Sequence, residues 1–278
     1  MAAAPESSSD WEAGRGLFGI CGFGCESSRK CVCTLTPISK KDGGVRPIAM
    51  GETIWKAAAT AVIDAMAPVL PALLPDIQLG VAVTGGAVIA VHGVQSALDS
   101  SMSQVALLAD VANAFNALDR RAIAKALADR PETKPLWHMV RTAYGDHRSP
   151  LLVCGRRGLD SVLQSESGVR QGDVLASLLF ALTLQPVYER AVSVGCGDEP
   201  QSVSAYAVLD DVTFVGRWDR VKAAFGSFVE GCEQLSQIII KPQTARGQRQ
   251  DRSPDSRPGR RRGGPDRTGG EGAGRDGR

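Results

Sequence analysis

Hydrophobic side chains recur every three or four positions in several segments of the chain, the spacing of one face of a helix. The segment ETIWKAAATAVIDAMAPVL, residues 52–70, shows this spacing and is bounded by prolines at 68 and 71. It is predicted to form a helix. The same spacing predicts helices at 86–98, about 117–128, about 134–143, 173–192 and 220–235.

Short apolar runs between these helices predict strands. The run QVALLAD (104–110) is interpreted as a buried strand that ends on an aspartate, and AYAVLDDVTFVG (205–216) as two strands flanking an aspartate pair. Turn signals predict a hairpin centred on residues 42–44, a strand pair at 150–164 and a strand at 238–241. This mixed order indicates an α+β fold in which a sheet carries helices on one face.

Composition changes sharply at both ends of the chain. Residues 1–34 are rich in Gly, Ser and Cys without periodicity, and they are predicted to be a poorly ordered leader. Residues 245–278 consist largely of Arg, Gly, Pro, Asp and Gln, with too few apolar side chains to offset the entropy of ordering. They are predicted to be a disordered Arg/Gly-rich tail. Such a tail is typical of nonspecific phosphate binding, and equally of a truncated or frame-altered end.

Charge, apolar segment length and cysteine spacing argue against a membrane protein, a secreted protein and a zinc site. The net charge of +2 comes from the tail, since residues 241–278 hold 11 Lys and Arg against 5 Asp and Glu. The apolar segments are shorter than the ~20 residues of a membrane span, and no secretory signal is visible, so we expect an intracellular protein without a membrane partner. Cysteines at 21, 25, 31 and 33 match no usual zinc spacing, which favours free thiols over a metal site.

Three aspartates and one loop stand at the ends of predicted elements. Asp110 follows a strand, Asp210 and Asp211 lie between two strands, and the loop SGVRQGD (167–173) precedes an apolar helix. Gathered carboxylates repel one another unless a cation neutralises them, and Mg²⁺ prefers oxygen ligands. Two such ions ~4 Å apart support phosphoryl transfer. Taken alone, the aspartate pair also fits a solvated hairpin turn.

The motifs LADVANAFNALDR, SGVRQGDVLASLLFAL and AYAVLDDVTFVG, in this order, resemble the three central palm motifs of reverse transcriptases, especially those of non-LTR retrotransposons. Upstream, LTPISKKDGGVRPIAMGETIWK is similar to their fingers region, and LPDIQLGVAVTGGAVIAVHGVQSAL to the segment that follows it. The resemblance covers about residues 35–241. It implies a polymerase palm, an antiparallel sheet with helices packed on one face, and a partial fingers region within a domain at 35–244.

The resemblance also implies roles for individual residues. It matches Asp110, Asp210 and Asp211 to the catalytic carboxylates, which hold two Mg²⁺ ions, or Mn²⁺ as an alternative, together with the carbonyl of Val111. Phe115 matches the bulky residue that excludes a ribose 2′-hydroxyl. The remaining matched positions contact the nucleotide, its triphosphate or the template, and they are Arg46, Gln171, Gly172 and Lys241.

The function implied is RNA-directed DNA polymerisation, with an RNA template, a DNA primer and a dNTP as partners and a nuclear setting. An inactive retroelement remnant that at most binds nucleic acid is the alternative, since Val208 stands where the family usually has an aromatic residue. An RNA-dependent RNA polymerase or a nucleotide cyclase is a third hypothesis. Phe115 favours deoxynucleotides and so argues against it.

Overall fold

The computed structural model describes residues 32–40, 43–145, 149–155 and 158–235, and the backbone of 239–245. The described residues belong to one compact unit, residues 1–247. The predicted tail beyond Ala245 and most of the predicted leader, with Cys21, Cys25 and Cys31, lie outside them.

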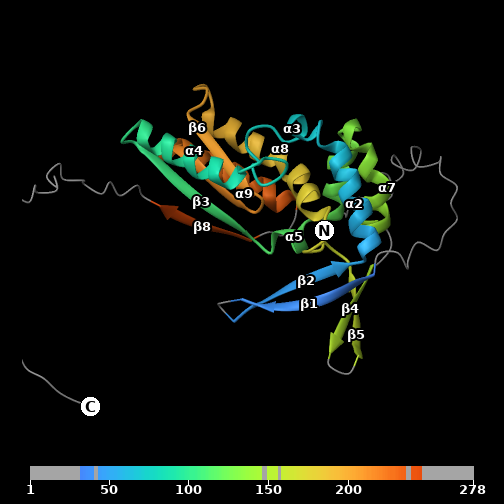
Figure 1. The fold of residues 1–278 in the computed structure, drawn as a ribbon. Coiled ribbons are helices and arrows are strands. Elements are labelled where there is room, and N and C mark those ends of the chain that lie inside the picture. Colours follow the sequence, from blue (N-terminus) through green and yellow to red (C-terminus); the bar gives the residue numbers. More distant parts are fainter. Residues whose placement is uncertain (1–31, 41–42, 146–148, 156–157, 236–238, 246–278) are drawn as a thin grey trace, which may run out of the picture. The chain divides into compact units, whose positions relative to one another are not determined.

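The first sheet joins two hairpins (Figure 1). Its strands, in the order β2-β1-β4-β5, are β1 (Cys33–Ser39), β2 (Val45–Gly51), β4 (Ser149–Gly155) and β5 (Gly158–Ser165). Both hairpins were predicted, but the parallel pairing of β1 with β4 was not. β1 begins at Cys33, before the predicted start of the domain at residue 35, because Cys33 is buried and pairs with Gly51.

The second sheet is antiparallel throughout, as the palm resemblance implies. Its strands, in the order β6-β7-β3-β8, are β6 (Val203–Val208), β7 (Asp211–Arg217), β3 (Gln104–Ala112) and β8 (Ile239–Ala245). β3 is longer than predicted. It passes Asp110 and ends at Ala112, because pairing with β8 continues to that residue.

Two long helices cover one face of the second sheet. They are α8 (Ala176–Cys196) and α9 (Trp218–Leu235). Phe214 of β7 packs on Phe228 of α9 with ring centroids 5.5 Å apart, and Tyr188 of α8 stacks on the same phenylalanine at 5.5 Å. These buried rings lie at the centre of the hydrophobic core.

A third helix, α4 (Gly86–Ser100), lies on the opposite face of the second sheet. Tyr206 of β6 points away from the Phe214 face, because Phe214 pairs with the neighbouring Ala205 and side chains alternate along a strand. A methyl group on Gly93 of α4 would collide with the Tyr206 ring. The expected packing of helices on one face therefore holds for α8 and α9, and α4 adds a layer on the other side (Figure 1).

The other helices contribute buried side chains to the core. They are α2 (Thr53–Met66), α3 (Leu70–Leu73), α5 (Ala114–Ala117), α6 (Arg120–Ala128), the 3₁₀ turn η2 (Pro131–Thr133) and α7 (Lys134–Tyr144). The predicted helix at 117–128 begins three residues later, where the Asp119 side chain accepts a hydrogen bond from the Arg121 N–H at 2.8 Å and caps α6. Among the described residues, none of the helices combines the length and apolar character needed to cross a membrane.

Candidate active site

The three predicted aspartates come together at one end of the second sheet. Asp110 near the end of β3 pairs directly with Asp211, the first residue of β7. Asp210 lies in the turn just before β7, and its carbonyl accepts a hydrogen bond from the Val111 N–H at 3.3 Å. The antiparallel register therefore places carboxylates that are a hundred positions apart in the sequence next to one another.

These carboxylates lie in an unfavourable electrostatic environment. Burial raises the pKa of Asp210, and the charges of Asp211 and Asp110 raise it further, while Arg46 partly opposes them. Burial and the charge of Asp110 likewise raise the pKa of Asp211. Among the described residues none of the three forms an ion pair. The site thus carries excess negative charge on oxygen ligands, which suits a hard divalent cation.

The present arrangement does not form a closed metal site. In the part of the chain that the structure describes, no three His, Cys, Asp or Glu side chains are grouped closely enough to hold one ion. The three carboxylates fit Mg²⁺ in chemistry and in charge. The Val111 carbonyl was also predicted as a ligand; the Val111 side chain is buried in the core.

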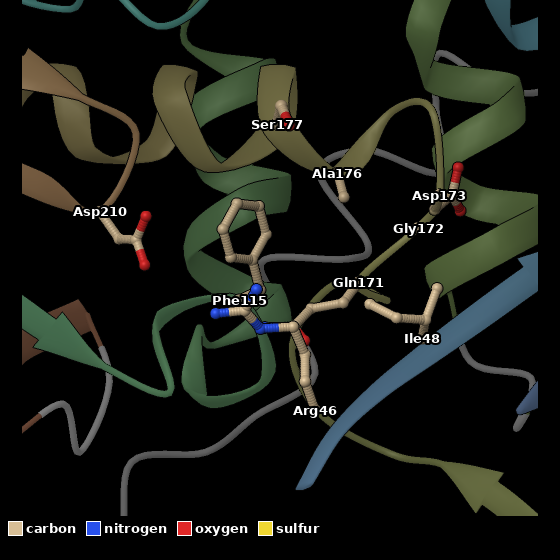
Figure 2. Close-up of a pocket in the computed structure, with 9 residues that line it drawn as sticks. All are labelled: Arg46, Ile48, Phe115, Gln171, Gly172, Asp173, Ala176, Ser177 and Asp210. Carbon is tan, nitrogen blue, oxygen red and sulfur yellow. The ribbon is translucent and has the colours of Figure 1, made fainter. Parts of the chain in front are cut away.

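A cleft of about 290 Å³ opens beside Asp210. This volume is near the lower limit of ~300 Å³ for ligand pockets, so the cleft can hold part of a nucleotide. Figure 2 shows that Arg46, Phe115 and Asp210, which come from separate segments of the chain, all line this cleft. The lining residues are Arg46, Ile48, Phe115, Gln171, Gly172, Asp173, Ala176, Ser177 and Asp210.

Phe115 is held in place at the wall of this cleft. Its ring stacks on buried Phe180 of α8 with centroids 4.9 Å apart. Its carbonyl accepts a hydrogen bond from the Val169 N–H at 2.7 Å, which ties α5 to the loop before α8. A bulky side chain with this support has little freedom to move away from a ligand in the cleft.

The loop carrying Gln171 and Gly172 lies against β2. The Gln171 carbonyl accepts a hydrogen bond from the Ala49 N–H at 2.7 Å. Gly172 has φ +98°, and a methyl group there would lie 2.9 Å from the Ala49 carbonyl oxygen, so only glycine fits. The side-chain Oε1 of Gln171 is buried without a hydrogen-bond partner among the described residues.

A buried polar network beneath this loop was missed by sequence reasoning. Arg170 and Asp173 form an ion pair at 2.9 Å, with side chains only 3% and 2% exposed. The Tyr144 hydroxyl donates to Asp173 at 2.5 Å, and the Arg170 guanidinium lies 4.8 Å from the centre of the Tyr144 ring. Burial, followed by the charge of Asp173, raises the pKa of Tyr144 and keeps it a donor. The sequence offered one sign of this network, namely that Arg170 and Asp173 flank Gln171 and Gly172.

The last predicted residue, Lys241, is placed by backbone register alone. Its Cα atom is paired with that of Asp110 across β8 and β3. The backbone position is therefore adjacent to the aspartates, and the role of its side chain stays a prediction.

Comparison with known families agrees with this geometry. The family model described as reverse transcriptase (RNA-dependent DNA polymerase) matches residues 38–239. The chain belongs to the reverse transcriptase family. The second sheet with α8 and α9 is the palm of such an enzyme, and the first sheet belongs to a partial fingers region.

Individual relatives of this reverse transcriptase chain come from retroelements and telomerases. The retrotransposable element SLACS 132 kDa protein of Trypanosoma brucei gambiense is 29% identical over 209 residues, which are 73% of this chain and 16% of that protein. The chain thus spans a small part of that relative.

Two solved structures share the fold of the reverse transcriptase chain. Apo telomerase from Candida tropicalis, truncated from its C-terminal domain, superposes with a TM-score of 0.57 at 12% identity, covering 81% of this chain and 52% of that one. Telomerase from Candida albicans in complex with a TWJ fragment of telomeric RNA gives a TM-score of 0.59 at 10% identity, covering 80% of this chain and 42% of that one. At such identities the likeness concerns the fold alone.

Asp173→Ala is expected to destabilise the chain by roughly 3–5 kcal/mol, because it removes the carboxylate that forms a buried ion pair with Arg170. Urea unfolding would measure this change. Asp129→Ala is the matched control, because Asp129 forms an exposed ion pair with Lys125, whose side chain is 76% exposed against 56% for Asp129. We expect this variant to lose less than about 1 kcal/mol of unfolding free energy. Equal losses for the two variants would contradict the structural role of the network.

In metal-free buffer the unfolding free energy is expected to fall as pH rises through the raised pKa values of Asp210 and Asp211. The folded chain binds these protons more tightly than the unfolded chain, so their loss favours unfolding. Asp210→Asn should reduce this fall, and the exposed control Asp64→Asn should not. Thermal unfolding between about pH 4 and about pH 8 would measure it. Identical pH profiles for both variants would refute the prediction.

Proposed function

We propose that this reverse transcriptase chain joins a deoxynucleotide to the 3′-hydroxyl of a DNA primer on an RNA template. The observation that carries the proposal is the set of three aspartates at the end of the palm sheet, beside a cleft lined by Arg46 and Phe115. The pKa values of Asp210 and Asp211 are both raised and Asp210 lines a ligand-sized cleft, which is typical of a functional site.

The aspartates are proposed to hold two divalent cations. Asp110, Asp210 and Asp211, with the carbonyl of Val111, would supply the oxygen ligands; Mg²⁺ is the preferred ion and Mn²⁺ the alternative. When bound, such a pair of ions activates an attacking hydroxyl and stabilises the leaving oxygen in phosphoryl transfer. The excess negative charge that burial makes costly at Asp210 would then be neutralised.

The residues of the cleft are proposed to bind and orient the nucleotide. Arg46 is exposed on β2 and lies on the cleft with Asp210, where its charge suits a triphosphate. Lys241, paired with Asp110 through its backbone, is proposed to assist the leaving pyrophosphate. The partnerless Oε1 of Gln171 can accept a hydrogen bond, and Gly172 lets the backbone lie close to β2 as the nucleotide and template pass.

Phe115 is proposed to select deoxynucleotides. Its ring is fixed by the stack on Phe180 and lies at the cleft, so a ribose 2′-hydroxyl directed toward it would meet a rigid wall. This proposed role distinguishes the chain from an RNA-dependent RNA polymerase with a similar palm sheet, the third hypothesis of the sequence analysis.

The proposed partners follow from the relatives. SLACS is named a retrotransposable element, and the Candida albicans telomerase is in complex with a telomeric RNA fragment. We therefore propose an RNA template, a DNA primer and a nuclear setting, with catalysis in the domain predicted at residues 35–244. A chain that binds nucleic acid without extending a primer is the second candidate, favoured by Val208 where an aromatic residue is usual.

Primer extension on an RNA template with Mg²⁺ and dNTPs tests the proposal. Asp210→Ala should lower the rate roughly 100-fold or more, because metal catalysis contributes several kcal/mol to the transition state. Asp219→Ala is the control, since this exposed aspartate pairs with Arg217 away from the cleft, and we expect full activity. Extension that survives in the Asp210 variant would refute the assignment. A wild-type chain that binds the template but never extends would establish the second candidate.

Phe115→Ala should raise the ratio of ribonucleotide to deoxynucleotide incorporation by roughly 10- to 100-fold, because steric exclusion of one small group contributes about 1–3 kcal/mol. Competition between rNTP and dNTP in single-nucleotide extension would measure the ratio. Phe225→Ala, on α9 and outside the cleft, is the matched control. A ratio that does not differ between the two variants would exclude Phe115 as the selecting residue.

A further inference from the structure

The turn that presents Asp210 contains a leucine in an unfavourable backbone conformation. Val208 pairs with Asp211, so Leu209 and Asp210 form the two-residue loop of the hairpin, here called the aspartate turn. Leu209 has φ +57°, in the left-handed region, which is sterically unfavourable for a residue with a Cβ atom. Such a conformation persists only where neighbouring groups hold it. The question is which groups do so.

Gln78 provides the main hold on the aspartate turn. Its side chain is fully buried, at 0% exposure. The Leu209 N–H donates to Gln78 Oε1 at 2.9 Å, and Gln78 Nε2 donates to the Leu209 carbonyl at 3.4 Å. One side-chain amide therefore satisfies both backbone groups of the left-handed residue, as a neighbouring strand would do.

The backbone around Gln78 is itself bound to the hairpin. Ala207 of β6 donates its N–H to the Ile77 carbonyl at 2.8 Å and accepts from the Leu79 N–H at 2.7 Å. The Gly80 N–H donates to Gln78 Oε1 at 2.9 Å and so fixes the orientation of the amide. A methyl group on Gly80 would lie 2.8 Å from the Leu209 nitrogen, so this close approach needs glycine.

Tyr188 of α8 adds a second side-chain contact to the aspartate turn. Its hydroxyl donates to the Leu209 carbonyl at 3.0 Å, and its ring stacks on Phe228 in the core. Both bonds to this carbonyl come from fully buried side chains. The conformation of the aspartate turn is thus decided from two directions by groups outside the hairpin.

We propose that Gln78 is a positioning residue: by holding Leu209 in the left-handed conformation it orients the Asp210 carboxylate toward Asp110 and Asp211, and so sets the affinity of the site for divalent cations. The inference rests on the proposed function, because it assigns the aspartates to cation binding. Loss of the Gln78 amide lets Leu209 relax to negative φ, which swings the following residue. Residues that orient metal ligands typically change metal affinity by ~10- to 100-fold when removed.

The test compares two buried glutamines in the full chain. Gln78→Met keeps the size of the side chain and removes its hydrogen bonds to Leu209. Gln185→Met is the matched control, because this equally buried amide donates to the Pro75 carbonyl at 3.1 Å and to Glu189 at 2.9 Å. Mn²⁺ binding without nucleotide is measured from the electron-paramagnetic signal of the free ion. Hydrogen exchange of the Leu209 amide reports the turn itself.

We expect Gln78→Met to weaken Mn²⁺ binding by ~10- to 100-fold and to expose the Leu209 amide. Gln185→Met should lower the melting temperature without changing the Mn²⁺ affinity more than about twofold, which is what a purely structural role predicts. Leu209→Gly in the Gln78→Met chain should recover most of the affinity, because glycine adopts positive φ without the steric cost. Unchanged affinity in Gln78→Met, or no recovery with glycine, would overturn the inference.

Two further measurements keep the outcomes distinct. If Gln78→Met does not fold, Tyr188→Phe takes its place in the test. This variant preserves the stack on Phe228 and removes one bond to Leu209, so we expect a smaller loss of Mn²⁺ affinity. A wild-type chain that binds Mn²⁺ but extends no primer would refute the polymerase proposal and leave the comparison of glutamines valid. A wild-type chain that binds no Mn²⁺ would overturn the inference about Gln78.

Discussion

The antiparallel pairing of β3 with β7 brings Asp110 directly opposite Asp211, and every other feature of the site depends on this register. A shift of β3 by one residue would turn the Asp110 carboxylate to the core face and the apolar side chain of Ala109 away from the core. The buried face against α8 and α9 therefore protects the register. The hydrophobic core and the active site therefore lie on opposite faces of one strand pair.

The carboxylates collected in this way oppose folding while they are ionised. Burial and mutual repulsion raise the pKa values of Asp210 and Asp211, so the folded chain is less stable with both charged. The same uncompensated negative charge on oxygen atoms favours the binding of divalent cations. The stacked rings of Tyr188 and Phe228, with Phe214 packed on Phe228, stabilise the core face of the same sheet.

Rigidity around the cleft comes from buried polar groups. The Arg170–Asp173 pair with Tyr144 fixes the loop of Gln171, and Gln78 fixes the turn of Asp210. Each of these buried groups would be costly if left unpaired, so each has a strong preference for one arrangement. The two walls of the cleft are thereby held by separate networks, which can be perturbed one at a time.

The sequence by itself determined the helices, the strands and the aspartates, because apolar spacing and turn residues act over a few neighbouring positions. It also ordered the motifs that identify the family. The tertiary structure alone decided the parallel pairing of β1 with β4, the crossing of α4 over the open face, and the contact of Gln78 with Leu209. These join segments far apart in the chain, and no local pattern encodes them. The left-handed Leu209 is the clearest case, since leucine disfavours that conformation and only its distant partners stabilise it.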